Sequence, residues 1–323
     1  MTRINDISEK EFKKHGRTRF SGALKNGFTS GVFTSGALLK VMIPTMAAVW
    51  VLKRIGALDV LARWTSTFMS VFHLPGETAL VLITGGLVNI YAAIAVAVNI
   101  PLTGQEMTIL AIMVLIAHNL LVETAVQSRA GTPAVIMLST RLGAAGLAGI
   151  IFARIIPESS DPVIRAAGEM GEGSQMAAVY GNVLSLFKIV IIIVVLMVLI
   201  EAMREYGIMD RITAALEKPM KALGMDSRTS FVAAVGLVLG IAYGAGIIIN
   251  EANRSRIGKK EILATNLFLG TNHALLEDSF IFAAVGAGLG WIVLGRLVFG
   301  IIFFQIALPL ILYLWKLEEK SSI

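Results

Sequence analysis

Two histidines of this chain each precede a carboxylate by five residues inside an apolar segment. The stretch IAHNLLVETAV holds His118 and Glu123, and the stretch TNHALLEDSFI holds His273 and Asp278. A charged side chain at the centre of a bilayer costs at least about 2.5 to 3.5 kcal/mol, so such groups are functional candidates by default. Imidazole and carboxylate together suit divalent cations such as Mn, Fe or Zn, and they also suit a proton-coupled polar solute.

An arginine follows each carboxylate 18 residues later, Arg141 after Glu123 and Arg296 after Asp278. A short turn between them would place carboxylate and arginine at similar depth on neighbouring antiparallel helices. Removing one partner of a buried ion pair is strongly unfavourable, so such a pair would lock two helices together. The spacing therefore predicts two structural ion pairs, Glu123 with Arg141 and Asp278 with Arg296, with contact to a substrate as the alternative.

Helix geometry limits how these groups can meet. On a straight α-helix His118 and Glu123 lie about 140° apart around the axis, so they do not share a face. They can act together only where the helix is kinked or unwound, and Asn119, Asn272 and Thr271 can bond the backbone groups freed at such a break.

His273 and Glu277, at positions i and i+4, do share a helix face. One buried histidine would more often bond a backbone carbonyl, but two at matching positions favour a shared site. The predicted substrate-binding residues are His118, Asn119, Glu123, His273, Glu277, Asp278, Asn89 and Asn272. The predicted metal ligands among them are His118, His273, Glu123, Glu277 and Asp278. Asn250 and Glu251 are secondary candidates, expected at a solvated interface.

The composition is that of a polytopic membrane protein. Of 323 residues 56% are hydrophobic and only 15% are charged, with mean hydropathy +0.77. The chain has no cysteine, which excludes disulfides and thiolate ligands. The net charge of +6 lies mostly in loops and tails, where it sets membrane orientation rather than nucleic-acid binding. The basic first 34 residues lack the apolar core of a signal peptide.

The chain also contains an internal duplication. The segment from Arg54 resembles the segment from Glu205 at an offset of 151, and further along the offset becomes 155, which aligns His118 with His273 and Arg141 with Arg296. The predicted organisation is a basic cytoplasmic segment (1–34), a first repeat (35–155), a polar linker (156–180), a second repeat (181–316) and a tail (317–323).

The Gly-interrupted segments 77–99 and 229–250 decide the topology. If both re-enter the membrane as hairpins the repeats are inverted, and if both span it there are eight crossings and parallel repeats. The inverted arrangement puts five Lys and Arg residues on outside loops against nine in the parallel one, so it is favoured. We expect an all-α polytopic membrane protein with two inverted repeats. Each would have about three spanning helices, one re-entrant helical hairpin and one amphipathic interfacial helix, at 57–73 and 208–223.

The segments LKVMIP and FKIVII, each followed by a glycine, an amphipathic stretch and a Gly-interrupted hairpin, resemble the nucleoside-recognition, or Gate, domain family. The resemblance covers about 35–315. It implies inverted repeats with a substrate site at the hairpin tips and broken helices. Concentrative nucleoside transporters, the membrane core of the ferrous-iron transporter B and spore-maturation proteins A and B share the domain. The iron transporter's Gate cysteine is missing, and no Gln/Thr/Glu nucleoside-binding hairpin is found.

We expect a secondary transporter of a small charged or polar solute, with a divalent metal ion as the first candidate, held between the repeats at the membrane midplane. A small organic anion or a nucleoside-like solute is the alternative cargo, and a non-transporting scaffold like the spore-maturation proteins is the alternative role. No enzyme motif or cofactor site is found, so any bound metal would be substrate. The expected partners are the lipid bilayer, the solute and further copies of the chain in a homo-oligomer. The expected location is the bacterial cytoplasmic membrane, with both termini in the cytoplasm.

Overall fold

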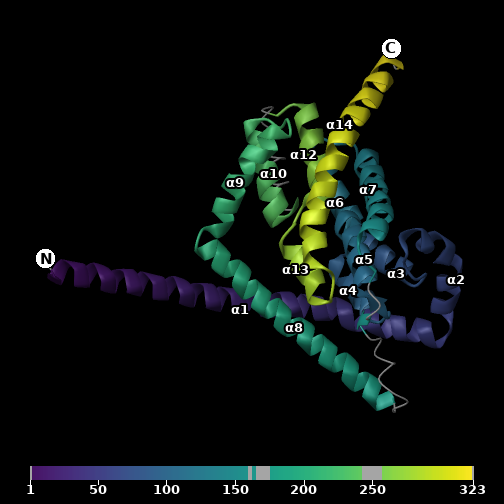
Figure 1. Cartoon of the computed structure of the whole chain (residues 1–323), viewed down its shortest axis with the longest axis horizontal. Coiled ribbons are helices and arrows are strands. Elements are labelled where there is room, and N and C mark those ends of the chain that lie inside the picture. The colour runs from purple at the N-terminus through teal and green to yellow at the C-terminus, as the bar shows by residue number, and fades with distance from the viewer. Residues whose placement is uncertain (1, 159–161, 165–174, 242–256, 322–323) are drawn as a thin grey trace.

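The computed structural model describes residues 2–158, 162–164, 175–241 and 257–321. These residues form helices almost throughout, as expected for an all-α membrane protein (Figure 1). Three helical stretches in the described residues are long and apolar enough to cross a bilayer, namely Gly104–Arg129, Ala134–Ile155 and Trp291–Leu314. The two short strands β1 (Leu102–Thr103) and β2 (Pro162–Ile164) pair antiparallel.

The first half begins with a 53-residue helix and continues in shorter ones. Its core is α5, in which every residue from Met107 to Ile116 is buried. A capping box, in which the Thr103 hydroxyl and the Glu106 carboxylate bond each other's backbone N–H, starts this helix. The elements are α1 (Thr2–Arg54), α2 (Ala57–Met69), η1 (Ser70–Phe72), α3 (Thr78–Leu87), α4 (Ile90–Ala97), α5 (Gly104–Ala117), α6 (Leu120–Arg129) and α7 (Ala134–Ile155).

The second half repeats this order where it is described. Its elements are α8 (Gln175–Glu205), α9 (Ile208–Ala222), α10 (Ser227–Leu239), α12 (Lys259–Asn272), α13 (Glu277–Ala284), η2 (Trp291–Gly295, a π-helical turn) and α14 (Arg296–Ser321). The predicted linker thus ends within α8, which begins at Gln175. Helices α2 and α9 occupy the two predicted amphipathic stretches. Each follows a glycine in the left-handed region, Gly56 with φ 72° and Gly207 with φ 65°.

The Gly-interrupted segment of the first half forms a helical hairpin. Helices α3 and α4 have 10 and 8 residues, are joined by Val88 and Asn89, and pack against each other. At 1.5 Å per residue, neither helix is long enough to cross about 30 Å of hydrocarbon. In the second half α10 stands at the position equivalent to α3 and is followed by Gly240, with φ 92°. The rest of that segment after residue 241, together with the secondary candidates Asn250 and Glu251, lies outside the described residues. Inversion and membrane re-entry stay predictions.

Helices α1 and α8 cross each other beneath the rest of the molecule (Figure 1). The contact uses a stripe of small buried residues on α1, Ala23, Gly27, Gly31 and Ser35. An added Cβ would lie 2.5 Å from Val198 Cα at Gly27 and 2.8 Å from Val194 Cα at Gly31. The two helices are therefore antiparallel at this point. Because α1 runs unbroken through residue 34, the predicted separate N-terminal segment includes part of this helix pair.

Replacing Gly27 by leucine is expected to destabilise the protein by about 1 to 3 kcal/mol, because the side chain must push the backbone of α8 away. Gly22→Leu is the matched control, since a Cβ there meets nothing within 4 Å. The measurement is the thermal unfolding temperature of the two variants in detergent. Equal melting temperatures would contradict the close helix crossing.

Candidate functional site

Both histidines stand where a buried helix is broken. Helix α5 ends before His118, Asn119 adopts φ 49°, and α6 then begins at Leu120. Helix α12 ends before His273, and Ala274 adopts φ 45° ahead of α13. Because His118 and Glu123 would lie about 140° apart on a straight helix, such a break is what allows them to meet.

Helices α3 and α10 hold the two breaks through equivalent hydrogen bonds. The backbone N–H of Asn119 donates to the Gly85 carbonyl at 2.9 Å, and that of Ala274 donates to the Gly236 carbonyl at 3.2 Å. These four residues match one another in the duplication. The carbonyl of a glycine in α3 or α10 therefore satisfies the donor freed at each break, as expected for irregular backbone buried in a membrane protein.

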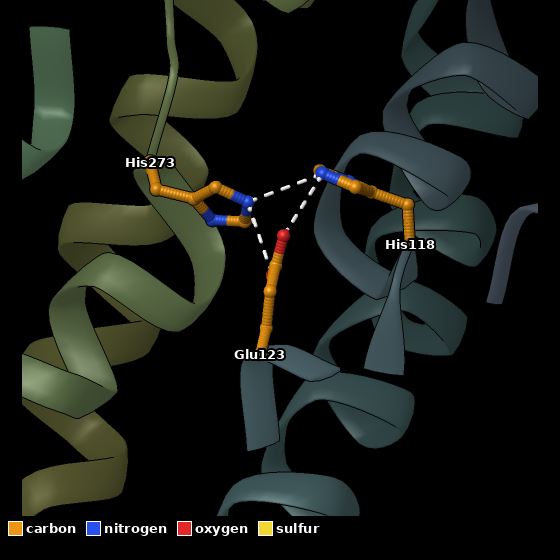
Figure 2. A group of neighbouring side chains, drawn as sticks. All are labelled: His118, Glu123 and His273. Carbon is orange, nitrogen blue, oxygen red and sulfur yellow. Dashed lines mark hydrogen bonds and ion pairs between the residues drawn. The ribbon is translucent and has the colours of Figure 1, made fainter. Parts of the chain in front are cut away.

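The two histidines face each other across the interface between the halves, with Glu123 beside both (Figure 2). The Nε2 atoms are 3.3 Å apart. Glu123 Oε1 lies 3.3 Å from His118 Nε2, and Glu123 Oε2 lies 3.2 Å from His273 Nε2. All three side chains are buried, with exposed fractions of 6% for His118, 9% for Glu123 and 2% for His273.

Backbone carbonyls determine which nitrogen of each ring carries its proton. His118 Nδ1–H donates to the Leu115 carbonyl at 3.2 Å, and His273 Nδ1–H donates to the Leu269 carbonyl at 2.8 Å. A carbonyl can only accept, so in each neutral ring the lone pair is on Nε2. Two lone pairs and a carboxylate therefore point at one spot, which is unfavourable unless a cation lies between them.

Arg141 joins the first helix break to Glu123. Its Nη1 lies 2.8 Å from Glu123 Oε2, its Nε donates to the Ile116 carbonyl at 3.0 Å, and its Nη2 donates to the His118 carbonyl at 2.8 Å. The side chain is fully buried. Arg141 thus satisfies two carbonyls freed at the break and orients the carboxylate that faces both histidines.

The second predicted ion pair, Asp278 with Arg296, is not in direct contact in this structure. Within the described part of the chain no oxygen of Asp278 lies within 4.0 Å of a nitrogen of Arg296, although both side chains are buried. Arg296 Nη2 donates to the His273 carbonyl at 3.4 Å, as Arg141 does to His118, but Nε and Nη1 have no partner. Asp278 Oδ2 lies 3.6 Å from His118 Nε2 instead. The second carboxylate faces the histidines rather than its own arginine.

The remaining candidates have other surroundings. Asn89 caps α4 by accepting a hydrogen bond from the Ala92 N–H. Asn272 donates to Thr271 Oγ1 and to the Phe268 carbonyl, while its own Oδ1 is buried without a partner. The sequence placed His273 and Glu277 on one helix face, but α12 ends between them, and no ion pair joins them in the described residues. Asn119 forms the bend rather than a side-chain cap.

A buried amide contact between the halves was missed by the sequence analysis. Gln127 Nε2 donates to the Asn266 carbonyl at 3.0 Å, and Asn266 Nδ2 donates to the Gln127 carbonyl at 3.2 Å and to Thr132 Oγ1 at 2.8 Å. Their equivalents in the duplication, Phe282 and Ala111, are apolar. Two amide side chains within otherwise apolar segments are the signal that could have identified this contact.

The fold and this site define a class: an all-α membrane protein with buried polar residues at two broken helices. Comparison with known proteins agrees. Residues 186–288 match the family described as nucleoside recognition, or Gate. The chain is 30% identical over 267 residues to the uncharacterized membrane protein YvoD of Bacillus subtilis strain 168, an alignment that covers 80% of this chain and 86% of that protein. No solved structure matches significantly. The chain belongs to the nucleoside-recognition (Gate) family of membrane proteins.

Proposed function

We propose that this protein is a secondary transporter that carries a divalent metal ion through the site formed by His118, Glu123 and His273. The observation that carries the proposal is the convergence of three side chains: the two Nε2 atoms are 3.3 Å apart, each lies 3.2 to 3.3 Å from one oxygen of Glu123, and one ligand atom from each residue lies within 4.8 Å of the others. Ligands about 2.1 Å from one metal ion in tetrahedral geometry lie about 3.4 Å apart. Two imidazoles and a carboxylate suit Zn, Mn or Fe, and the chain offers no thiolate for softer ions.

The hydrogen bonds behind the ligands support the same proposal. Metal-binding histidines usually donate their other ring N–H to a carbonyl or a carboxylate, which fixes the tautomer and the orientation of the ring. Both histidines here do so to backbone carbonyls. Asp278 Oδ2, 3.6 Å from His118 Nε2, is a further oxygen that can reach the ion after a small shift.

A proton can occupy the same place when the metal is absent. An imidazolium N–H on either ring can donate to Glu123 or to the other ring, which removes the clash of lone pairs. We therefore propose that metal and proton compete for this site and that a proton gradient drives transport. The metal ion is cargo rather than a cofactor, and no enzymatic reaction is proposed. The proposed setting is a bacterial cytoplasmic membrane with both termini in the cytoplasm.

The test is uptake of Zn²⁺ or Mn²⁺ into proteoliposomes that carry a proton gradient. We expect flux with the wild type and none with the His118→Ala/His273→Ala variant, because both nitrogen ligands are lost while the Glu123–Arg141 pair remains. His73→Asn is the matched control, since His73 is exposed at the end of η1. Equal flux with the double variant would contradict the proposal. Wild-type protein that neither binds nor moves a metal would favour a scaffold role.

A further inference from the structure

The two halves of the site do not adopt the same arrangement, although their residues match at a constant offset of 155. In the first half Arg141 forms an ion pair with Glu123 at 2.8 Å and donates hydrogen bonds to two carbonyls. In the second half Arg296 keeps only the bond to the His273 carbonyl, at 3.4 Å, and two of its nitrogens have no partner. A fully buried guanidinium with no carboxylate in contact is costly, and an arrangement that brings Asp278 into contact with it would lower that cost.

The helix that carries each arginine also differs between the halves. Arg141 lies on the regular α-helix α7, but Arg296 directly follows the π-helical turn η2, Trp291–Gly295. The offset between the halves is the same before and after this turn, so no inserted residue requires it. A π-helical turn rotates the residues that follow it relative to an α-helix. Such turns are rare overall and are frequently found at functional sites.

The hydroxyl group next to each carboxylate also differs between the halves in its hydrogen bonding. Ser279 Oγ donates to the Ile292 carbonyl, inside the π-helical turn, at 3.4 Å. The equivalent hydroxyl in the first half belongs to Thr124, and it is buried without a hydrogen-bond partner. One half therefore has a bonded hydroxyl and an unpaired arginine, while the other has a free hydroxyl and a paired arginine.

We propose that these are the two positions of one switch, and that the second half also adopts the arrangement of the first. In that state Ser279 releases the Ile292 carbonyl, the π-helical turn becomes α-helical, and Arg296 turns to pair with Asp278. Asp278 Oδ2 then leaves the neighbourhood of His118 Nε2, from which it is now 3.6 Å away. The role of this movement in transport, withdrawal of the second carboxylate from the metal, rests on the function proposed above. The switch itself does not.

The first test is a double-mutant cycle in metal-free protein, read as the thermal unfolding temperature. We expect Asp278→Asn/Arg296→Gln to melt above Arg296→Gln alone, because the single change leaves Asp278 without the partner it reaches in the second state. The Glu123→Gln/Arg141→Gln cycle is the reference for a pair already in contact at 2.8 Å. If the changes in unfolding temperature caused by Asp278→Asn and by Arg296→Gln simply add up in the double variant, the pairing does not occur. A double variant that unfolds at the same temperature as Arg296→Gln alone, or at a lower one, would also contradict the pairing.

Trp291 provides a direct readout, because it begins the π-helical turn and packs edge-on against Phe152, with ring centroids 6.2 Å apart. In protein whose other tryptophans, Trp50, Trp64 and Trp315, are replaced by phenylalanine, Ser279→Ala is expected to shift the emission of Trp291. Adding Arg296→Gln should reverse the shift, and Ser279→Thr should show none. Thr124→Ala is the matched control with no expected change. An unchanged emission spectrum in Ser279→Ala overturns the switch.

Adding Zn²⁺ separates this inference from the proposed function. If the metal binds as proposed, it attracts Asp278 and returns the emission of the Ser279→Ala variant toward that of the wild type. If the metal-free results hold and Zn²⁺ has no effect, the switch stands and the metal-transport proposal fails. If Zn²⁺ stabilises the wild type while Ser279→Ala shows no emission shift, the transport proposal stands and the switch fails.

Discussion

Arg141→Gln is expected to lower the free energy of unfolding by about 3 to 5 kcal/mol, the largest stability change predicted for a single substitution in this chain. The guanidinium is fully buried and bonds Glu123 and the carbonyls of Ile116 and His118. Glutamine can replace at most part of these bonds, and it leaves Glu123 as a buried charge without its arginine. Thermal unfolding in detergent and the yield of folded protein are the measurements.

Arg154→Gln is the control for this prediction. Arg154 lies on the same helix but is exposed, and its hydrogen bond goes to the Ile150 carbonyl within that helix. Surface changes of this kind usually alter stability by no more than about 0.5 kcal/mol. Equal unfolding temperatures for Arg141→Gln and Arg154→Gln would show that the buried bonds do not hold the helix break in place.

The membrane class, the helices and the pairing of halves could be read from the sequence because each leaves a periodic or repeated signal. Apolar runs of about 20 residues indicate membrane helices. The offset of 155 placed His118 and His273 at equivalent positions, and the predicted inversion of the repeats would bring such residues together. The need for a break between His118 and Glu123 followed from helix geometry alone. The bend at Asn119 fits that prediction, because asparagine tolerates the left-handed region better than most residues.

The differences between the halves could not be predicted from spacing, because they depend on the local conformation and on the reach of each side chain, and the Asp278 side chain is one methylene shorter than that of Glu123. Asp278 and Arg296 have the same spacing as Glu123 and Arg141, so the sequence predicted two equal ion pairs. In the structure a π-helical turn precedes Arg296 but not Arg141, and the two side chains of the second pair are not in contact. Glu277 was assigned to the site from its i, i+4 spacing to His273. The i, i+4 spacing does not put these two residues on one face, because α12 ends at Asn272 and α13 begins only at Glu277.

If the site binds a divalent ion as proposed, its charges would make the binding weak. Glu123 and Arg141 cancel each other, and Asp278 and Arg296 have equal and opposite charges. A divalent ion held by two neutral imidazoles would therefore leave a net charge of about +2 in a region of low dielectric. Arg141 also competes for Glu123 and weakens it as a ligand. A conducting site must bind its ion strongly enough to admit it and weakly enough to release it.

Glu123→Gln is expected to abolish metal binding, with a loss of affinity of more than about 100-fold, because it removes the carboxylate that faces both histidines. It should also destabilise the metal-free protein, since Arg141 then keeps only its carbonyl partners. The measurement is the rise in unfolding temperature on adding Zn²⁺, which depends directly on affinity.

Glu277→Gln separates this outcome from a general effect of removing a buried carboxylate. Glu277 is half-buried in the first turn of α13, and in the described residues it has no contact with either histidine. We expect this variant to keep the Zn²⁺-dependent rise, while Glu123→Gln loses it. If Glu277→Gln lost the Zn²⁺-dependent rise in unfolding temperature while Glu123→Gln kept it, Glu277 rather than Glu123 would be the ligand, and the proposed ligand set would be contradicted. Retention in both variants would mean that Zn²⁺ binds elsewhere on the protein.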